Sequence, residues 1–363
     1  MTESTASEPA PTLAETLQRL APGTQLRDAL ARIQRGNTGA IIVIGDGDDV
    51  TSLCDGGIEF DVPFAPTRLR ELCKMDGAVI LSDDGTRIRR ANVQLVPSPS
   101  YPTQESGTRH RSAERTALET GRPVVAVSQS MNIITLYVDG VRHVLEEPAA
   151  ILARANQAIA TMERYRTRLD VANQRLFTSE LGGYATVHSV ASVLEREVML
   201  KRVGLELDRD VLELGTDGRQ LSLQLTELRG DNDREISMLL RDYLVSAGPP
   251  SEEQLTDALA LLDQLADADL LQSTNISRIL GLPATEEALA QWIVPRGYRV
   301  LSQIPRVQPF LMDKLVTAFG DVRSLFQASE EDLADVDAVG ALWARHIYEG
   351  LRGAAQLKRS VIP

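Results

Sequence analysis

Short apolar runs separated by turn residues follow one another from residue 39 to about residue 145. They read GAIIVIGD, GAVILSDDGTRI, ANVQLVP, RPVVAVSQ and NIITLYVDGVRHVL. Runs of this length that are rich in Val and Ile and bounded by Gly, Asp or Pro are typical of β-strands. Asp84-Gly85 and Asp139-Gly140 lie between such runs, and this indicates tight hairpins.

Helical spacing precedes and interrupts these runs. Apolar residues recur at helical intervals over residues 14–35, 67–74 and 109–120, and Gly121 is placed to end the last helix. Strands that alternate with helices predict an α/β domain with a mixed sheet and flanking helices, which we assign to residues 12–147.

From residue 148 onward, the apolar positions have the spacing of amphipathic helices alone. The segment EEPAAILARANQAIATMERYRTRLDVANQRLF carries one apolar face, and Pro148 suits a first helical turn. Residues 187–203, 218–229 and 234–246 continue the pattern, and Ser251-Glu-Glu-Gln254 forms a capping box. We expect an all-helical spacer over residues 148–293, interpreted as a strut without chemistry of its own.

The last segment, residues 294–363, contains two helix-turn-helix repeats. They read YRVLSQIPRVQPFLMDKLVTAFG and SEEDLADVDAVGALWARHIYEGL. Nine Lys and Arg stand against eight Asp and Glu from Arg296 to Pro363, whereas the whole chain carries a formal net charge of −13. The pattern predicts a third, all-helical domain. Its net charge of about +1 would repel nucleic acid less than the net charge of −13 of the whole chain does.

Composition limits the compartment and the kinds of partner. The 363 residues suffice for two or three domains, and the net charge of −13 excludes a protein held on DNA or an acidic membrane by bulk electrostatics. Residues 1–11 lack the features of a secretion signal and predict a disordered tail. No apolar run approaches the roughly 20 residues that span a bilayer, so we expect a cytoplasmic protein with no membrane partner.

Two motifs in the α/β domain indicate an anion site. MDGAVILS places Asp76, Gly77 and Ala78 at the entrance to a strand, and GTRHRS places Thr108 to Ser112 at the head of a helix. Arg-His-Arg at the positive end of a helix is unfavourable unless an anion binds there. Arginine forks, helix amides and hydroxyl groups together would form a polyphosphate cradle, and Asp76 could hold Mg²⁺ or Mn²⁺.

Spacing alone leaves simpler interpretations of these motifs open. A basic cluster on a helix is usually a solvated face, and Asp-Gly is usually a turn. A dinucleotide-binding loop is rejected, because Gly45 and Gly47 are followed by Val50 at the position of the third glycine.

The motif residues resemble a known family. ELCKMDGAVILS followed by GTRHRSAER, with GGIEFDVPF upstream and PVVAVSQ downstream, resembles the diadenylate cyclase domain, whose DGA and RHR motifs are family hallmarks. The order of the parts also resembles that of the DNA-integrity scanning diadenylate cyclases over nearly the whole chain. These proteins have a cyclase domain, then a helical spacer and then a C-terminal helix-hairpin-helix unit. The resemblance implies condensation of two ATP into cyclic di-AMP and two pyrophosphates at a two-fold interface of a homo-octamer. It further implies inhibition by branched DNA, such as Holliday junctions, bound to the C-terminal domain.

The resemblance also implies roles for single residues. Asp76 would bind the metal and orient or activate the attacking 3′-hydroxyl, while Arg109 and Arg111 would hold phosphates with His110 between them positioning the nucleotide. Further ATP contacts would come from Gly77, Ala78, Leu95, Thr108, Ser112 and Ser128, with Leu95 against the base. The general base stays open, because a metal-bound carboxylate is a poor proton acceptor and His110 could equally be structural.

The C-terminal hairpins depart from the family pattern. A helix-hairpin-helix unit binds the sugar-phosphate backbone through hairpin N–H groups that glycines let approach. Here Ala338 replaces the first expected glycine of VDAVG, only Gly340 remains, and IPRVQP has none. Arg306, Lys314 and Gly340 are the candidate DNA contacts, and the alternative is a helical assembly module without DNA contacts. For the whole chain, the alternative function is a non-catalytic, nucleotide-sensing protein that binds DNA structures.

Overall fold

The computed structural model describes residues 11–361, so the tail predicted for residues 1–11 lies outside the described residues except for Pro11. The chain divides into two compact units, which we describe separately. The first contains the residues up to Gln157 together with Leu207–Gln224, and the second contains Ala158–Glu206 and the residues from Leu225 onward. Within the described range, no helix is both long and apolar enough to cross a membrane.

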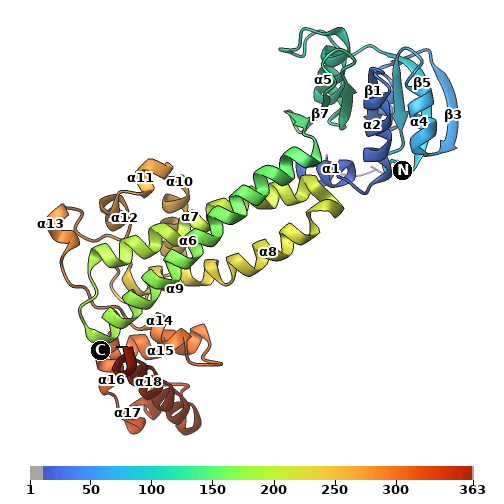
Figure 1. Ribbon diagram of the computed structural model, residues 1–363. Helices are drawn as coiled ribbons and strands as arrows, with labels where there is room; N and C mark the ends of the chain where they lie inside the picture. The colour runs from blue at the N-terminus through green and yellow to red at the C-terminus, as the bar shows by residue number, and fades with distance from the viewer. Residues whose placement is uncertain (1–10, 362–363) are drawn as a thin grey trace. The chain divides into compact units, whose positions relative to one another are not determined.

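The first unit contains the predicted α/β fold with a mixed sheet (Figure 1). The strands run in the order β2-β5-β4-β1-β6-β7-β8, with β3 paired to β5. Among the strands of residues 11–361, only β1 and β4 pair in parallel. The strands are β1 (Ala40–Ile44), β2 (Cys54–Asp55), β3 (Ile58–Pro63), β4 (Ala78–Leu81), β5 (Arg87–Leu95), β6 (Val124–Val127), β7 (Ile134–Val138) and β8 (Val141–Leu145). The helices are α1 (Leu13–Leu20), α2 (Gln25–Arg35), α3 (Asp48–Thr51), α4 (Pro66–Leu72) and α5 (Thr108–Thr120).

Both predicted hairpins are confirmed. Asp139 and Gly140 join β7 to β8 with φ angles of 52° and 68°, which suit a primed two-residue turn. Gly85, with φ of 71°, lies in the turn between β4 and β5. Gly121, with φ of 67°, ends α5 in the left-handed conformation expected of a C-terminal glycine.

The helix predicted over residues 14–35 is wrong as a single element. The structure has α1 and α2 instead, separated by a break at residues 21–24. Gly23 adopts φ of 91°, outside the helical region, and Thr24 caps α2 by accepting a hydrogen bond from the Arg27 amide at 3.1 Å. The apolar periodicity continues across the break because α1 and α2 each bury one apolar face.

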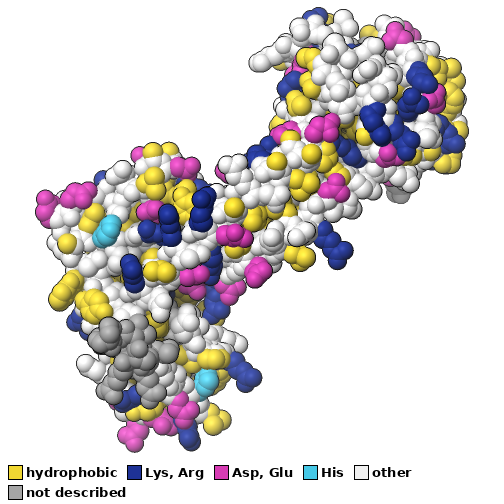
Figure 2. All heavy atoms as spheres, in the orientation of Figure 1, with side chains coloured by type: hydrophobic (Ala, Val, Ile, Leu, Met, Phe, Trp, Pro, Cys, Tyr) yellow, Lys and Arg dark blue, Asp and Glu magenta, His cyan; other side chains and the backbone are white. Residues whose placement is uncertain are grey.

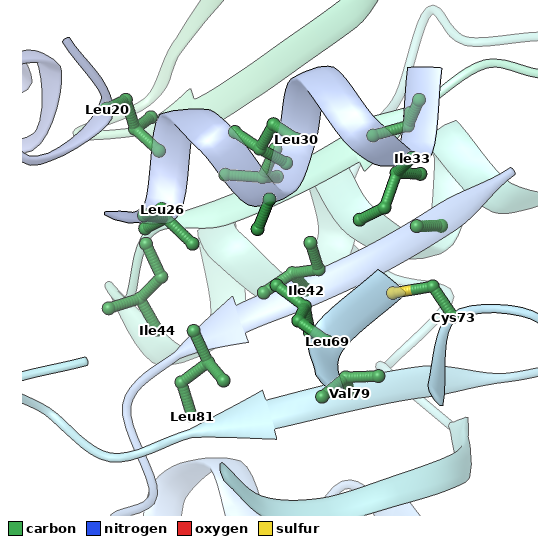
Figure 3. Close-up of a cluster of buried hydrophobic side chains, with 14 of the residues drawn as sticks. Leu20, Leu26, Leu30, Ile33, Ile42, Ile44, Leu69, Cys73, Val79 and Leu81 are labelled. Carbon is green, nitrogen blue, oxygen red and sulfur yellow. The ribbon is translucent and has the colours of Figure 1, made fainter. Parts of the chain in front are cut away.

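Apolar residues cover both faces of the sheet. Leu30 and Ile33 of α2 lie over Ile42 of β1, with Leu69 of α4 beside them (Figure 3). The alternate residues of β1 belong to a second buried cluster that includes Ala113 of α5. A strand that is buried on both faces has a continuous apolar run in its sequence, and this explains why GAIIVIGD lacks polar alternation.

Charges of both signs are interspersed on the face of the protein that Figure 2 shows. In the first unit, Arg89 pairs with Asp46 at 2.7 Å, and Arg122 pairs with Asp49 at 3.0 Å. Asp83 also pairs with Arg122, at 2.5 Å. These arginines are therefore neutralised locally by side chains of the chain itself.

The remaining elements are helical, as predicted. The helices α6 (Pro148–Gly182) and α7 (Val187–Leu214) each contribute residues to both units. They are followed by η1 (Gly215–Gly218), α8 (Arg219–Arg229), α9 (Asn232–Tyr243), α10 (Glu252–Gln264), α11 (Asp267–Leu270), α12 (Ser273–Ile279) and α13 (Glu286–Leu289). The last helices are α14 (Tyr298–Ser302), α15 (Pro309–Phe319), α16 (Val322–Gln327), α17 (Glu330–Ala334) and α18 (Ala341–Val361). The domain boundaries at 147/148 and 293/294 stay predictions.

The capping box at the start of α10 is confirmed. The Ser251 hydroxyl accepts a hydrogen bond from the Gln254 amide at 3.2 Å, and the Gln254 side chain accepts one from the Ser251 amide at 3.0 Å. Two backbone donors at the helix start are thereby satisfied, as the sequence motif requires.

Candidate functional site

A cavity of about 590 Å³ in the first unit brings the two sequence motifs together. It is bounded by the start of β1, the loop from β2 to β3, the entrance of β4, the end of β5 and the first turn of α5. Among its lining residues are seven predicted site residues: Asp76, Gly77, Ala78, Leu95, Thr108, Arg109 and Ser112. The motifs are separated by about thirty positions in the sequence, and the sheet places both on one cavity.

Asp76 is exposed at the entrance of β4. One carboxylate oxygen accepts a hydrogen bond from the Gly77 amide at 3.1 Å. An exposed carboxylate on the same cavity as a helix N-terminus suits Mg²⁺ or Mn²⁺, because these cations usually combine one or two carboxylates with substrate phosphate oxygens. The donor set therefore fits a divalent cation shared with a bound polyphosphate.

The start of α5 forms one side of the cavity and is the predicted phosphate-binding element. Thr108, Arg109 and Ser112 line it, and the N-cap residue Gly107 makes no side-chain capping bond. The first-turn amides and the positive end of the helix dipole therefore face the kind of site in which anions bind. Arg109 reaches the cavity past Gly39, where a Cβ atom would overlap its guanidinium group.

His110 is buried behind this helix turn and does not line the cavity. Its Nδ1 lies 2.9 Å from the Tyr137 hydroxyl, which donates to Glu105 at 2.8 Å. Because that hydroxyl has a single proton, His110 donates to it from Nδ1. Burial lowers the pKa of His110, although Glu105 opposes the shift. His110 thus joins the first turn of α5 to Tyr137 of β7 through a buried hydrogen bond.

Arg111 and Ser128 also lie away from the cavity lining. The exposed Arg111 side chain donates to the carbonyl oxygens of Glu105 and Ser106 at 3.4 and 3.3 Å, and so holds the loop that leads into α5. Ser128 is buried just after β6, and its hydroxyl accepts a hydrogen bond from the Met131 amide at 3.2 Å. Of the predicted site residues in this domain, the structure therefore leaves three outside the cavity: His110, Arg111 and Ser128.

The cavity also contains residues that the sequence interpretation missed. Asp55, Gly56 and Gly57 line one wall, and Asn92 and Gln94 of β5 line another. The Gly-Gly pair in CDGGIEF was a usable signal, because two adjacent glycines before a strand permit a close backbone approach. Asn92 had no comparable signal, because ANVQL has the appearance of an ordinary strand.

Both C-terminal hairpins keep a left-handed residue without glycine. Arg306 has φ of 66°, and the Val307 amide donates to the Ile304 carbonyl at 3.4 Å. Ala338 has φ of 70° at the matching place of the second hairpin. The missing glycines therefore have not abolished the turn geometry, although each left-handed side chain costs some stability.

The other candidate DNA contacts differ in their surroundings. Gly340 is exposed and has φ of 33°. Lys314 is half-buried and forms an ion pair with Asp337 at 2.7 Å, so its charge is already compensated. Arg306, whose side chain is exposed, is the better placed of the two cations.

The chain is similar to known proteins over almost its whole length. Residues 27–142 match the family model described as DisA bacterial checkpoint controller nucleotide-binding, and residues 145–289 match that of the DisA linker region. The DNA integrity scanning protein DisA of Corynebacterium efficiens is 64% identical over 340 residues, covering 94% of this chain and 96% of that protein. The protein of the same name from Acidothermus cellulolyticus is 50% identical, covering 95% and 93%. DacA from Staphylococcus aureus, a solved structure, is 26% identical with a TM-score of 0.31, covering 37% of this chain and 88% of that one.

Proposed function

Because the chain belongs to the DisA family and is a diadenylate cyclase, a nucleotidyltransferase, we propose that it condenses two ATP into cyclic di-AMP and two pyrophosphates. The observation that carries the proposal is the single cavity that joins Asp76 to the phosphate-binding start of α5. A carboxylate for a cation and an arginine at a helix N-terminus are the groups that a triphosphate requires.

Each phosphodiester link forms by in-line displacement. The 3′-hydroxyl oxygen of one ATP attacks the α-phosphorus of the other, the new O–P bond forms as the bond to pyrophosphate breaks, and the hydroxyl proton is released to solvent. Positioning and charge neutralisation provide most of the catalysis in such a transfer. Arg109 and the α5 amides stabilise the phosphate charge, and Asp76 would hold a divalent cation that supplies further positive charge there. His110 supports α5 from behind rather than contacting the hydroxyl.

The product has two equivalent links, whereas the described residues of each chain form one cavity that is lined by both motifs. Two chains that face each other across a two-fold axis would place each 3′-hydroxyl opposite the other α-phosphate. We propose that the active species is at least this dimer, within the octamer that the resemblance implies. The specific activity should then fall on dilution as the dimers dissociate.

Gly39 offers a test of the role of Arg109. Gly39→Ala should lower the cyclase rate by about tenfold or more, because the added Cβ displaces the Arg109 guanidinium and misplaced groups lose positioning catalysis. The melting temperature should stay nearly unchanged, because the obstacle is the movable end of a side chain. Gly36→Ala is the matched control, since a Cβ there meets no atom closer than 3.3 Å. Equal rates for the two variants would contradict this role of Arg109.

We further propose that branched DNA binds the C-terminal hairpins and inhibits the cyclase. The left-handed turns at Arg306 and Ala338 support this, because they present hairpin N–H groups without glycine. The names of the relatives refer to scanning of DNA integrity. Because the chain is strongly acidic overall, such binding has to rest on a few local contacts.

Incubation of the purified protein with ATP and Mg²⁺ or Mn²⁺, with and without a four-way DNA junction, tests both proposals. Mass analysis should find cyclic di-AMP and pyrophosphate, with less product when the junction is present. Arg306→Gly keeps the left-handed turn but removes the charge, so it should weaken junction binding and reduce the salt dependence of log K by about 1. An equal rate of product formation with and without the junction would contradict inhibition by DNA and would favour the alternative that the C-terminal domain is an assembly module. Failure to form product with either metal would contradict the proposed reaction.

A further inference from the structure

Asn92, in the middle of β5, has a left-handed backbone with φ of 54°. Ala91 is buried in the core below α2, whereas Val93, two residues later, is buried in the core that includes α5. Residues two apart in a regular strand face the same side. The pairing of β5 with β4 shifts between Ala78 and Ile80, so a β-bulge at Asn92 turns the strand over.

Two glycines of the cavity pack against this bulge from opposite sides. A Cβ atom at Gly77 would lie 2.8 Å from the Val93 carbonyl oxygen and 2.9 Å from the Asn92 carbonyl carbon. A Cβ atom at Gly57 would lie 3.0 Å from the Ala91 carbonyl oxygen. A side chain at Gly77 would overlap the backbone of the bulge, and one at Gly57 would overlap the Val93 side chain, whose Cγ2 would lie 2.6 Å from the Cβ atom. The φ angles of 102° and 86° also favour glycine at both positions.

The contact with Gly77 links the bulge to the metal-binding position. Asp76 precedes Gly77 directly and accepts a hydrogen bond from its amide. Any change of the bulge that moves the Asn92–Val93 backbone therefore pushes on Gly77 and moves Asp76 relative to Arg109 across the cavity. Displacements of about 1 Å in such sites cost about 100-fold in rate.

We propose that Asn92 is a positioning residue of the cyclase reaction that acts through its left-handed backbone. It holds the bulge against Gly77 and thereby fixes the Asp76 carboxylate opposite the phosphate-binding start of α5. Asn and Gly adopt this conformation with little strain, whereas other residues, and β-branched ones above all, resist it. The reaction therefore depends on the left-handed conformation rather than on the carboxamide, although the carboxamide also lines the cavity.

A substitution series at Asn92 separates the backbone from the side chain. Asn92→Gly keeps the conformation and lacks the carboxamide, whereas Asn92→Ala and Asn92→Val lack the carboxamide and also strain the left-handed backbone. We expect the kcat of Asn92→Gly to stay within about threefold of wild type, that of Asn92→Ala to fall at least about tenfold and that of Asn92→Val about 100-fold. The KM for ATP should change less than kcat, because the phosphate-binding groups of α5 are untouched.

Asp139 provides the matched control. It has φ of 52° and is exposed, but it lies in the β7–β8 hairpin away from the cavity. As at Asn92, the alanine variant should have the lower melting temperature of the pair Asp139→Gly and Asp139→Ala. Both variants should leave kcat unchanged. If kcat falls only in the Asn92 series, the cause is a displaced Asp76 carboxylate and not a general loss of stability.

Hydrogen exchange provides a readout that does not depend on activity. The amides of residues 76–78 should exchange several-fold faster in Asn92→Ala and Asn92→Val than in wild type, and at the wild-type rate in Asn92→Gly. If Asn92→Gly is as inactive as Asn92→Ala, the carboxamide itself is required and the inference is overturned. Unchanged kcat and exchange in Asn92→Ala would overturn it too, even if Asn92→Val fails to fold. An inactive wild-type protein would contradict the proposed reaction, while the exchange rates would still decide the coupling of the bulge to Asp76.

Discussion

We expect Asp76→Asn to lower cyclic di-AMP formation by about 10³-fold or more and to leave the fold intact. The amide keeps the size of the carboxylate and can still accept the hydrogen bond of the Gly77 amide. It lacks the negative charge that binds a divalent cation, and the loss of such charge stabilisation is worth several kcal/mol in the transition state. Because Asp76 is exposed, the free energy of unfolding should change by less than about 0.5 kcal/mol.

The same sequence motif provides the control for this variant. Asp139-Gly140 precedes β8 as Asp76-Gly77 precedes β4, but Asp139 lies outside the cavity. Asp139→Asn should form cyclic di-AMP at the wild-type rate when products are resolved by mass with saturating ATP and Mg²⁺ or Mn²⁺. Substantial product from Asp76→Asn would assign the cation to another group, and Asp55 is the other carboxylate of the cavity.

Arg299→Met should destabilise the second unit by about 3–5 kcal/mol. The Arg299 guanidinium donates to Glu180 at 2.6 Å, and the two side chains are 6% and 0% exposed. Without the arginine, the Glu180 carboxylate stays buried with a hydrogen bond from the Tyr243 hydroxyl at 2.7 Å but no opposite charge. A buried carboxylate that loses its cation is strongly unfavourable, because its desolvation is no longer compensated.

Urea unfolding of matched variants tests this prediction. Arg345→Met removes an ion pair with Glu349 whose side chains are 69% and 63% exposed. The free energy of unfolding should therefore fall by less than about 0.5 kcal/mol. The double variant Arg299→Met, Glu180→Met should recover most of the stability, because apolar replacement of a buried pair is often neutral. Equal losses for Arg299→Met and Arg345→Met would show that the buried pair contributes no more than the exposed one.

Much of the fold was predictable because its signals are local. Strands and hairpins of the first unit follow from apolar runs and from Asp-Gly pairs, whose backbone preferences do not depend on distant residues. The helical second half follows from periodicity in the same way. The helix over residues 14–35 failed at a local detail, because Gly23 and Thr24 interrupt a periodicity that continues on both sides.

The site was predictable only in part. The motifs identify Asp76 and the start of α5, and the structure places them on one cavity. Sequence did not separate Arg109, which lines the cavity, from Arg111, which holds the preceding loop. Consecutive residues of a helix point in different directions, and which of them faces a cavity depends on the sheet beneath it. The roles of the individual residues stay predictions.

The amino-acid sequence by itself determined the family, the order of its helical and α/β parts, and the motif residues, because these depend on residue type and near neighbours. Only the tertiary structure decided that His110 bonds to Tyr137 behind the cavity and that Asn92 forms a bulge between Gly57 and Gly77. It also decided that Ala338 keeps a left-handed turn without glycine. Each of these depends on which distant segment packs against the residue, and that contact energy outweighs the local preference of the chain.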